Sequence, residues 1–184
     1  KRDRPAMHMV FTGNPGTAKT TVARLFARIM KENGLLSKGQ LIEVGRADLV
    51  GKYVGWTAPT VKSKFKAALG GVLFIDEAYS LVEDRDGLYG DEAINTIVQE
   101  MENHRDDVVV IFAGYPDKMK DFFAKNEGLR SRIAFHLDFP DYNAEELVDI
   151  LKLMADKKGY KLNPDIERKC LEIFAQAVKK EEFG

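Results

Sequence analysis

Short apolar runs alternate with amphipathic stretches along most of this chain. The apolar runs are typical of central parallel strands, which are covered on both faces. The longer stretches repeat apolar residues at intervals of three and four, which predicts helices with one buried face. Strands are predicted at residues 7–11, 41–44, 72–75, 108–113 and 133–139, and helices up to about residue 33 and at about residues 60–69, 91–101 and 118–125.

Strands that alternate with helices predict a parallel sheet with helices on both faces, which is a three-layer α/β fold. Residues 45–60 contain glycines and a proline and predict no regular element. After Pro140 the pattern changes to helices alone. The sequence therefore predicts an α/β domain over residues 1–139 and the start of a helical domain over residues 140–184.

Two polar residues predict where the helices of the second domain begin. Asn143 is followed three residues later by Glu146, which resembles a capping box. The helix that follows is expected to end near residue 158. Asn163 precedes Pro164, a combination typical of a helix start, and predicts a second helix to about residue 180.

Composition excludes several classes of protein. The 28 basic and 29 acidic residues give a formal net charge of −1, which does not favour nucleic acid or an anionic membrane surface as a partner. No apolar run approaches the length of a membrane span. The single cysteine, Cys170, cannot form an internal disulfide, so a reducing cytoplasmic setting is expected. The chain does not begin with methionine, and we expect it to be part of a longer protein.

A glycine-rich stretch joins the first predicted strand to the first predicted helix. It fits the phosphate-loop pattern G-x-x-x-x-G-K-[ST], except that an alanine replaces the second glycine. Backbone N–H groups of such a loop and of the following helix bind phosphate oxygens. The lysine is expected to reach the β- and γ-phosphates, and the first threonine to ligate Mg²⁺. The residues concerned are Gly13, Asn14, Pro15, Gly16, Thr17, Ala18, Lys19, Thr20 and Thr21.

Ala18 is the departure from this pattern, and its effect depends on the backbone. If position 18 requires a positive φ, alanine costs on the order of 1 kcal/mol or more and nucleotide affinity falls. If position 18 is already helical, alanine is harmless. The sequence leaves both alternatives open.

Two adjacent carboxylates follow the apolar run at residues 72–75. Asp76 stands at the expected carboxyl end of this strand, beside the phosphate loop, where it can complete the Mg²⁺ shell. Glu77 points to the other side of the backbone and can orient and deprotonate the attacking water. An Asp-Glu pair alone is weak evidence for a catalytic site, because it is most often just the end of a strand. Together with a phosphate loop earlier in the chain, it becomes a specific signal for a nucleotide-hydrolysing site.

Three stretches together resemble the AAA+ ATPases, over essentially the whole chain. They are residues 13–20, residues 71–79 and residues 139–142, and they are similar to the subgroup that contains the red-type rubisco activase CbbX and stage V sporulation protein K. The resemblance implies a P-loop ATPase, with Walker A and Walker B motifs, that forms ring hexamers and binds ATP between subunits. It also implies chaperone-like remodelling of a protein client that is pulled through a central pore.

The resemblance also implies roles for three further residues. Arg132 matches the arginine finger that reaches the ATP of the next subunit, with Arg130 as the alternative. From spacing alone, both could equally be arginines on a solvated turn, but the resemblance favours the finger. Tyr53 matches the pore loop, although Tyr53 and Trp56 could instead pack on their own sheet. The polar residue that usually ends the fourth strand is not evident, and the Tyr115 hydroxyl is a possible substitute. A second sensor would lie beyond residue 184.

The leading hypothesis is an ATPase with Mg²⁺ that remodels a protein client, either rubisco or a sporulation protein. The alternative is a nucleotide-regulated assembly or scaffold module whose ATPase activity is weak because of Ala18. A nucleic-acid motor is disfavoured by the charge balance and by the absence of a nucleic-acid-binding motif. The three histidines are far apart in sequence and predict no metal cluster.

Overall fold

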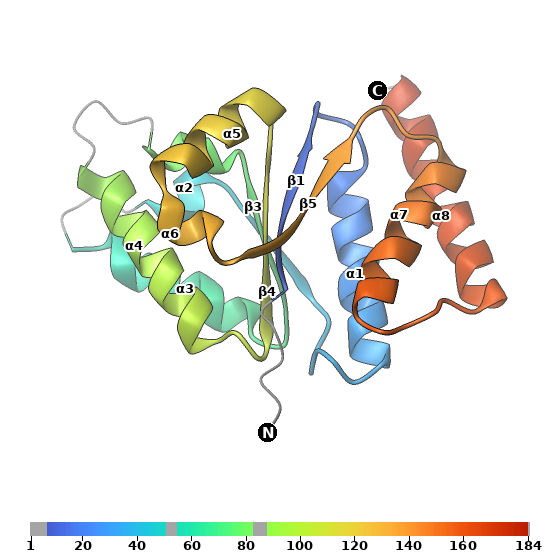
Figure 1. The fold of residues 1–184 in the computed structure, drawn as a ribbon, viewed down its shortest axis with the longest axis horizontal. Coiled ribbons are helices and arrows are strands. Elements are labelled where there is room, and N and C mark those ends of the chain that lie inside the picture. Colours follow the sequence, from blue (N-terminus) through green and yellow to red (C-terminus); the bar gives the residue numbers. More distant parts are fainter. Residues whose placement is uncertain (1–6, 51–54, 83–87, 184) are drawn as a thin grey trace.

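The computed structural model describes residues 7–50, 55–82 and 88–183, which form a parallel sheet between two layers of helices (Figure 1). The strand order is β2-β3-β4-β1-β5, and every strand pair is parallel. This arrangement confirms the three-layer α/β prediction. The strands are β1 His8–Gly13, β2 Leu41–Val44, β3 Gly71–Asp76, β4 Val108–Gly114 and β5 Ile133–Phe139.

Helices cover both faces of the sheet. Figure 1 shows α1, α7 and α8 on one side and α2 to α6 on the other. The helices are α1 Lys19–Glu32, α2 Arg46–Leu49, α3 Thr57–Ala68, α4 Leu88–Asn103, α5 Pro116–Lys125, α6 Glu127–Arg130, α7 Ala144–Lys157 and α8 Pro164–Phe183. A 3₁₀ helix, Ala78–Val82, follows β3 directly.

Alternating side chains of the strands supply two hydrophobic cores, because successive residues of a strand point to opposite faces. Phe11 and Phe74 belong to the core beneath α1, α7 and α8. Val10 and Phe112 belong to the core beneath α3, α4 and α5. The apolar runs in the sequence therefore serve both faces at once, as expected for central parallel strands.

Four helical segments, each either short or starting earlier than expected, were not predicted. Residues 45–60 contain all of α2 and the start of α3. The turn of α2 is stabilised by Asp48, whose carboxylate accepts a hydrogen bond from the Gly45 N–H at 2.9 Å. The four-residue helices α2 and α6 are too short to show helical periodicity, and α4 begins three residues before the predicted position. Short capped turns of this kind depend on local hydrogen bonds rather than on a repeating pattern.

The two helix starts in the second part of the chain are confirmed. The Asn143 side chain accepts from the Glu146 N–H at 2.9 Å, and the Glu146 side chain accepts from the Asn143 N–H at 3.2 Å. Asn163 caps α8 by accepting from the Ile166 N–H at 2.8 Å. Both helices pack with α1 in one core. The division between residues 139 and 140 therefore stays a prediction.

Candidate nucleotide-binding site

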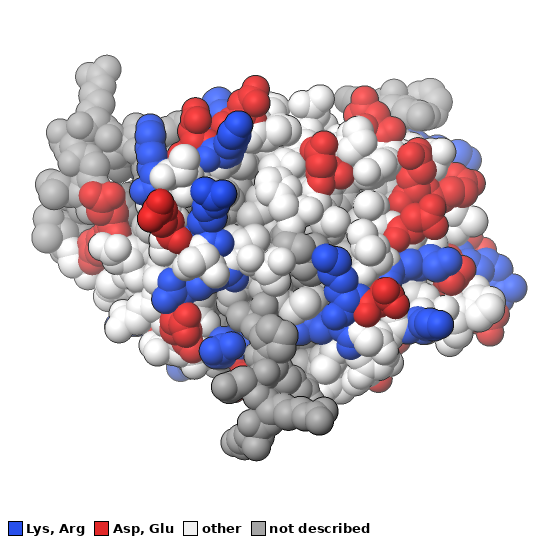
Figure 2. Space-filling view, viewed as in Figure 1, with Lys and Arg blue, Asp and Glu red and all other residues white. Residues whose placement is uncertain are grey.

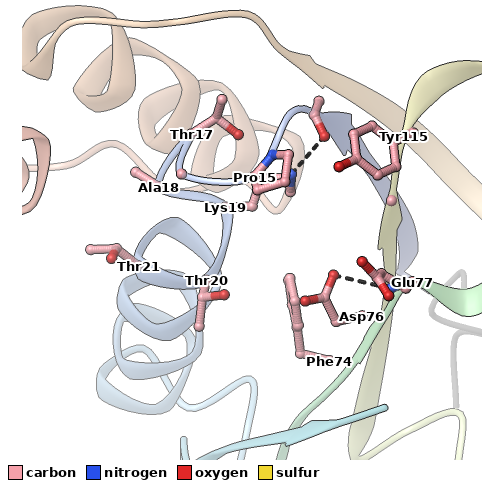
Figure 3. Close-up of a pocket in the computed structure, with 13 residues that line it drawn as sticks. Pro15, Thr17, Ala18, Lys19, Thr20, Thr21, Phe74, Asp76, Glu77 and Tyr115 are labelled. Atoms are coloured by element: carbon pink, nitrogen blue, oxygen red, sulfur yellow. Dashed lines mark hydrogen bonds between the residues drawn. The ribbon is translucent and has the colours of Figure 1, made fainter. Parts of the chain in front are cut away.

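A cavity of about 200 Å³ lies at the carboxyl ends of β1, β3 and β4 (Figure 3). Parallel sheets bind ligands at this edge, where loops from neighbouring strands meet. The predicted phosphate loop forms one wall, and the residues that follow β3 and β4 form the other. The lining residues are Gly13, Pro15, Gly16, Thr17, Ala18, Lys19, Thr20, Thr21, Phe74, Asp76, Glu77, Gly114 and Tyr115.

Lys19 is folded back over the loop that precedes it. Its ammonium group donates to the carbonyl oxygens of Gly13 at 2.8 Å and Asn14 at 2.9 Å. Thr17 closes the same loop by donating its hydroxyl to the Asn14 carbonyl at 2.8 Å. The loop is therefore held in shape by its own side chains, with the charge of Lys19 at the rim of the cavity.

Ala18 has a left-handed backbone, with φ 64° and ψ 19°, and only 6% of it is exposed. The positive φ of the first alternative is therefore the one observed. L-residues pay roughly 1–2 kcal/mol for this conformation, which glycine adopts freely. The chain keeps the backbone of a phosphate loop at position 18 without the residue that favours it.

The amino end of α1 is electrostatically suited to an anion. Ala18 occupies the N-cap position, and an alanine side chain cannot accept a hydrogen bond from the first turn. The first turn contains no acidic residue either. No side chain of α1 therefore neutralises the backbone N–H groups of the first turn or the positive end of the helix dipole, and both face the cavity.

Asp76 and Glu77 stand at the opposite wall. Asp76 is half-buried at the end of β3, and its Oδ1 accepts a hydrogen bond from the Glu77 N–H at 3.0 Å. Glu77 is exposed and has a φ of 50°, so the chain turns sharply at the point where the strand ends. In Figure 3 the Asp76 carboxylate is directed from β3 toward Thr20 of α1.

The oxygens of Thr20 and Asp76 are chemically suited to Mg²⁺. Both residues line the cavity, and hydroxyl and carboxylate oxygens are ligands that this hard cation prefers. Within the described residues, no group of three or more His, Cys, Asp or Glu side chains forms a metal site.

Both candidate arginines lie away from the cavity of their own chain. Arg132 directly precedes β5, and the other end of β5 lies beside the phosphate loop, where Phe139 pairs with Gly13. The length of the strand, roughly 20 Å, therefore separates Arg132 from the phosphate loop. The Arg132 Nε donates to Glu102 at 2.8 Å, and its Nη1 donates to the Gly128 carbonyl at 2.7 Å. Arg130 is exposed at the end of α6.

The predicted pore residue, Tyr53, lies outside the described residues. Trp56 is described and is 58% exposed at the N-cap of α3. The alternative that Trp56 packs on its own sheet is therefore wrong. Tyr115, offered above as a possible substitute for a polar residue, does line the cavity.

A second cavity of about 410 Å³, not predicted from the sequence, adjoins the first. It lies between the loop residues Gly16 to Ala18 on one side and the segment before α7 on the other, where Asp141 and Tyr142 line it. Val178 of α8 completes it. In the sequence this segment was marked by the change of pattern at Pro140 and by the resemblance over residues 139–142, but neither indicated a cavity.

Figure 2 shows basic and acidic side chains interspersed over the face drawn, without a stripe of one sign. Among the helices in the described part of the chain, none is both long and apolar enough to span a bilayer.

Comparison with protein families gives two matches that together cover most of the chain. The model of the family described as "ATPase family associated with various cellular activities (AAA)" matches residues 9–141. The model described as "AAA lid domain" matches residues 143–184. Among solved structures, the FIGL-1 AAA domain in complex with ADP is similar with a TM-score of 0.52 and 22% identity, over 92% of this chain and 55% of that one. At this identity the similarity shows the fold alone.

Curated relatives are much closer in sequence. The chloroplastic ribulose bisphosphate carboxylase/oxygenase activase of Cyanidioschyzon merolae is 51% identical over 98% of this chain and 62% of its own length. Protein CbbX of Cereibacter sphaeroides is 54% identical over 90% of this chain and 54% of its own length. Protein CfxQ of Xanthobacter flavus is 55% identical, covering 89% and 52% respectively. The chain thus spans less than two thirds of the length of these relatives.

Proposed function

This chain belongs to the AAA family of ATPases, and from that premise we propose that it binds ATP with Mg²⁺ in the cavity above β1, β3 and β4 and hydrolyses it. The observation that carries the proposal is the meeting of Lys19, Thr20, Asp76 and Glu77 around one cavity, although they come from separate parts of the chain. A cation and a hydroxyl at a helix amino end, facing two carboxylates at a strand end, are groups that phosphoryl transfer uses.

Each group has a physical task in this proposal. Lys19 exchanges its bonds to the loop carbonyls for bonds to the β- and γ-phosphates, while backbone N–H groups of the loop and of the first turn of α1 surround the phosphate oxygens. Thr20 and Asp76 would hold Mg²⁺, which supplies positive charge to the phosphate oxygens. Glu77 orients water for attack on the γ-phosphate and accepts its proton. The second cavity, beside Tyr142, would receive the nucleoside.

The location of Arg132 supports an oligomer. Because it lies at the edge of the sheet opposite its own cavity, Arg132 can contact a nucleotide only in a neighbouring subunit. Glu102 and Gly128 engage two of its five N–H donors, and three remain for a phosphate. Repetition of this head-to-tail contact around a closed ring is the hexamer that we propose. Arg130 remains the alternative finger.

The client that we propose is a protein, gripped by a pore loop containing Tyr53. The exposed Trp56 beside this loop adds a second aromatic ring, and aromatic rings can hold a polypeptide without reading its sequence. Relatives named as a rubisco activase support rubisco as the client, and a sporulation protein is the alternative. A cytoplasmic location and a helical lid over residues 140–184 are part of the same proposal.

Two variants test the proposal. Lys19→Ala should abolish binding of ATP and ADP in calorimetry, because the phosphates lose their only cation from the loop. Glu77→Gln should bind ATP with nearly unchanged affinity but hydrolyse it at least about a hundredfold more slowly, because an amide cannot accept the proton. Glu43→Gln, at an exposed position on β2, is the matched control and should change neither quantity. Unchanged ATP affinity in Lys19→Ala would exclude the site.

A second candidate function rests on the backbone of Ala18. A strained phosphate loop can weaken nucleotide binding, and the chain would then be an assembly or scaffold module with weak ATPase activity. The two candidates differ in turnover: steady hydrolysis that stops in Glu77→Gln belongs to the first alone.

A further inference from the structure

The carboxyl end of α4 carries a negative charge that the helix itself does not favour. Glu102 is the last residue but one of α4, and the last turn of this helix contains no basic residue. The dipole of a helix favours cations at its carboxyl end and disfavours carboxylates there. The position of Glu102 is therefore unfavourable for α4 alone, and a charge from another element must compensate it.

Arg132, which follows α6, supplies the compensating charge. Its Nε donates to Glu102 Oε1 at 2.8 Å. The pair lies at the surface, with 28% of the Arg132 side chain and 49% of the Glu102 side chain exposed. Ion pairs this exposed contribute little to folding stability. The main effect of the contact is therefore on where the guanidinium of Arg132 lies.

The backbone beneath Arg132 is anchored by α6. Leu129 is fully buried, and its carbonyl accepts a hydrogen bond from the Arg132 N–H at 3.0 Å. The Gly128 carbonyl accepts from Arg132 Nη1 at 2.7 Å and from the Ser131 hydroxyl at 3.1 Å. One part of the guanidinium is thus held by α6, and only the bond to Glu102 of α4 fixes the rest.

These two contacts leave one nitrogen of the guanidinium for a ligand. Arg132 Nη2 donates to none of the described residues, so both of its N–H groups remain for an oxygen of another molecule. A cavity of about 490 Å³ adjoins the pair and is lined by Glu102, Ser131 and Arg132, among others. The guanidinium is therefore oriented and accessible at the same time.

We propose that Glu102 is a positioning residue for Arg132, and that it orients the guanidinium before the nucleotide of a neighbouring subunit arrives. This inference rests on the proposed function and extends the contact between subunits to α4. A long side chain loses rotamer freedom when it engages a ligand, and earlier orientation removes that loss from the reaction. Because Glu102 contacts Arg132 and not the nucleotide, it acts on turnover and not on ATP affinity.

Glu102→Ala in the assembled protein is the direct test. The kcat for ATP hydrolysis should fall about tenfold or more, while the affinity for a non-hydrolysable ATP analogue stays within about twofold of the original. Glu102→Gln keeps an oxygen that accepts from Nε and should give an intermediate kcat. In an Arg132→Ala background, Glu102→Ala should cause no further loss, because the residue that it positions is already absent.

A mixing experiment separates positioning of the finger from damage to the fold. In an equal mixture of Glu102→Ala and Lys19→Ala, one interface in four joins an intact phosphate loop to a correctly held Arg132. The mixture should therefore reach roughly a quarter of the original activity and exceed Glu102→Ala alone, although half of its subunits lack Lys19. A defect confined to the Glu102→Ala subunit itself would make the mixture slower than Glu102→Ala alone.

Asp165→Ala is the matched control, since it removes another exposed ion pair, in which Arg168 Nη2 lies 2.9 Å from Asp165 Oδ1. It should leave kcat unchanged. The inference is overturned if Glu102→Ala hydrolyses ATP as fast as the original or faster, or if the mixture shows no gain. If Arg132→Ala itself leaves hydrolysis unchanged, the proposed role of Arg132 fails and this inference fails with it.

Discussion

Ala18 adopts a left-handed backbone conformation that alanine does not favour. Its φ of 64° places it in the left-handed region, and its methyl group is buried in the core beneath α1. Glycine would remove the strain, but it would also lose the buried methyl group and give the unfolded chain more freedom. These effects are each about 1 kcal/mol and oppose one another.

We therefore expect Ala18→Gly to change the free energy of unfolding by less than about 1 kcal/mol. Ala18→Val should lower it by more than about 2 kcal/mol, because a β-branched side chain tolerates positive φ poorly. Urea unfolding measures both values, and Ala67→Val at an exposed position of α3 controls for the helix propensity of valine. Equal stability of the valine and glycine variants would contradict the observed backbone.

The sequence predicted which residues form the phosphate loop but not the conformations of its side chains and backbone. The pattern around Lys19 predicted a phosphate loop, and the position of Ala18 within it was already marked as unusual. The φ of Ala18, the folded-back Lys19 ammonium and the orientation of Tyr115 were not predictable. Each depends on contacts with residues that are distant in sequence or on the closure of the loop as a whole.

At the scale of elements, the junction between β1 and β4 contains a buried histidine. His8 is 1% exposed, and its Nδ1 accepts a hydrogen bond from the Val110 N–H at 3.0 Å. The strand register of β1 against β5 also shifts beside His8. Burial, the largest effect, lowers the pKa of His8 from 6.5 to about 4.

This pKa predicts how stability depends on pH. In the unfolded chain His8 takes up a proton below pH 6.5, whereas the folded protein resists protonation down to about pH 4. The free energy of unfolding should therefore fall as the pH drops through this window, by up to about 3 kcal/mol. In His8→Asn, which keeps an acceptor for Val110, urea unfolding should show a weaker pH dependence. An identical slope in the two proteins would refute the assignment.

Long elements were predicted well and short ones were missed. Five apolar runs sufficed for the sheet, and the side chains of Asn143 and Asn163 marked two helix starts. By contrast, α2 and α6 are single turns without periodicity. The order of the strands was also beyond the sequence, because a run of apolar residues does not state which neighbour it pairs with.

At the scale of the whole molecule, the site and the candidate finger lie at opposite edges of one sheet. If Arg132 serves a neighbouring subunit, Arg132→Ala and Lys19→Ala should each be inactive alone. A mixture of the two in equal amounts should recover roughly a quarter of the activity, because one interface in four then combines an intact loop with an intact arginine. ATPase assays on reassembled mixtures measure this recovery.

The mixing experiment has a built-in contrast. Lys19→Ala combined with Glu77→Gln should recover nothing, since both changes disable the same cavity. Failure of the Arg132→Ala mixture to recover, with assembly verified by mass, would remove Arg132 as a residue that acts between subunits. Arg130→Ala would then be the next variant to mix.

The shared core of α1, α7 and α8 has a consequence for how the protein is made. Phe26 and Met30 of α1 are buried in the same hydrophobic core as Leu151 of α7 and Phe174 of α8. Because a ribosome releases α1 long before α7 and α8, the nascent chain must carry this apolar stripe uncovered until its last helices emerge. Between the release of α1 and the emergence of α7 and α8, the nascent chain is therefore most prone to aggregate and most dependent on a chaperone.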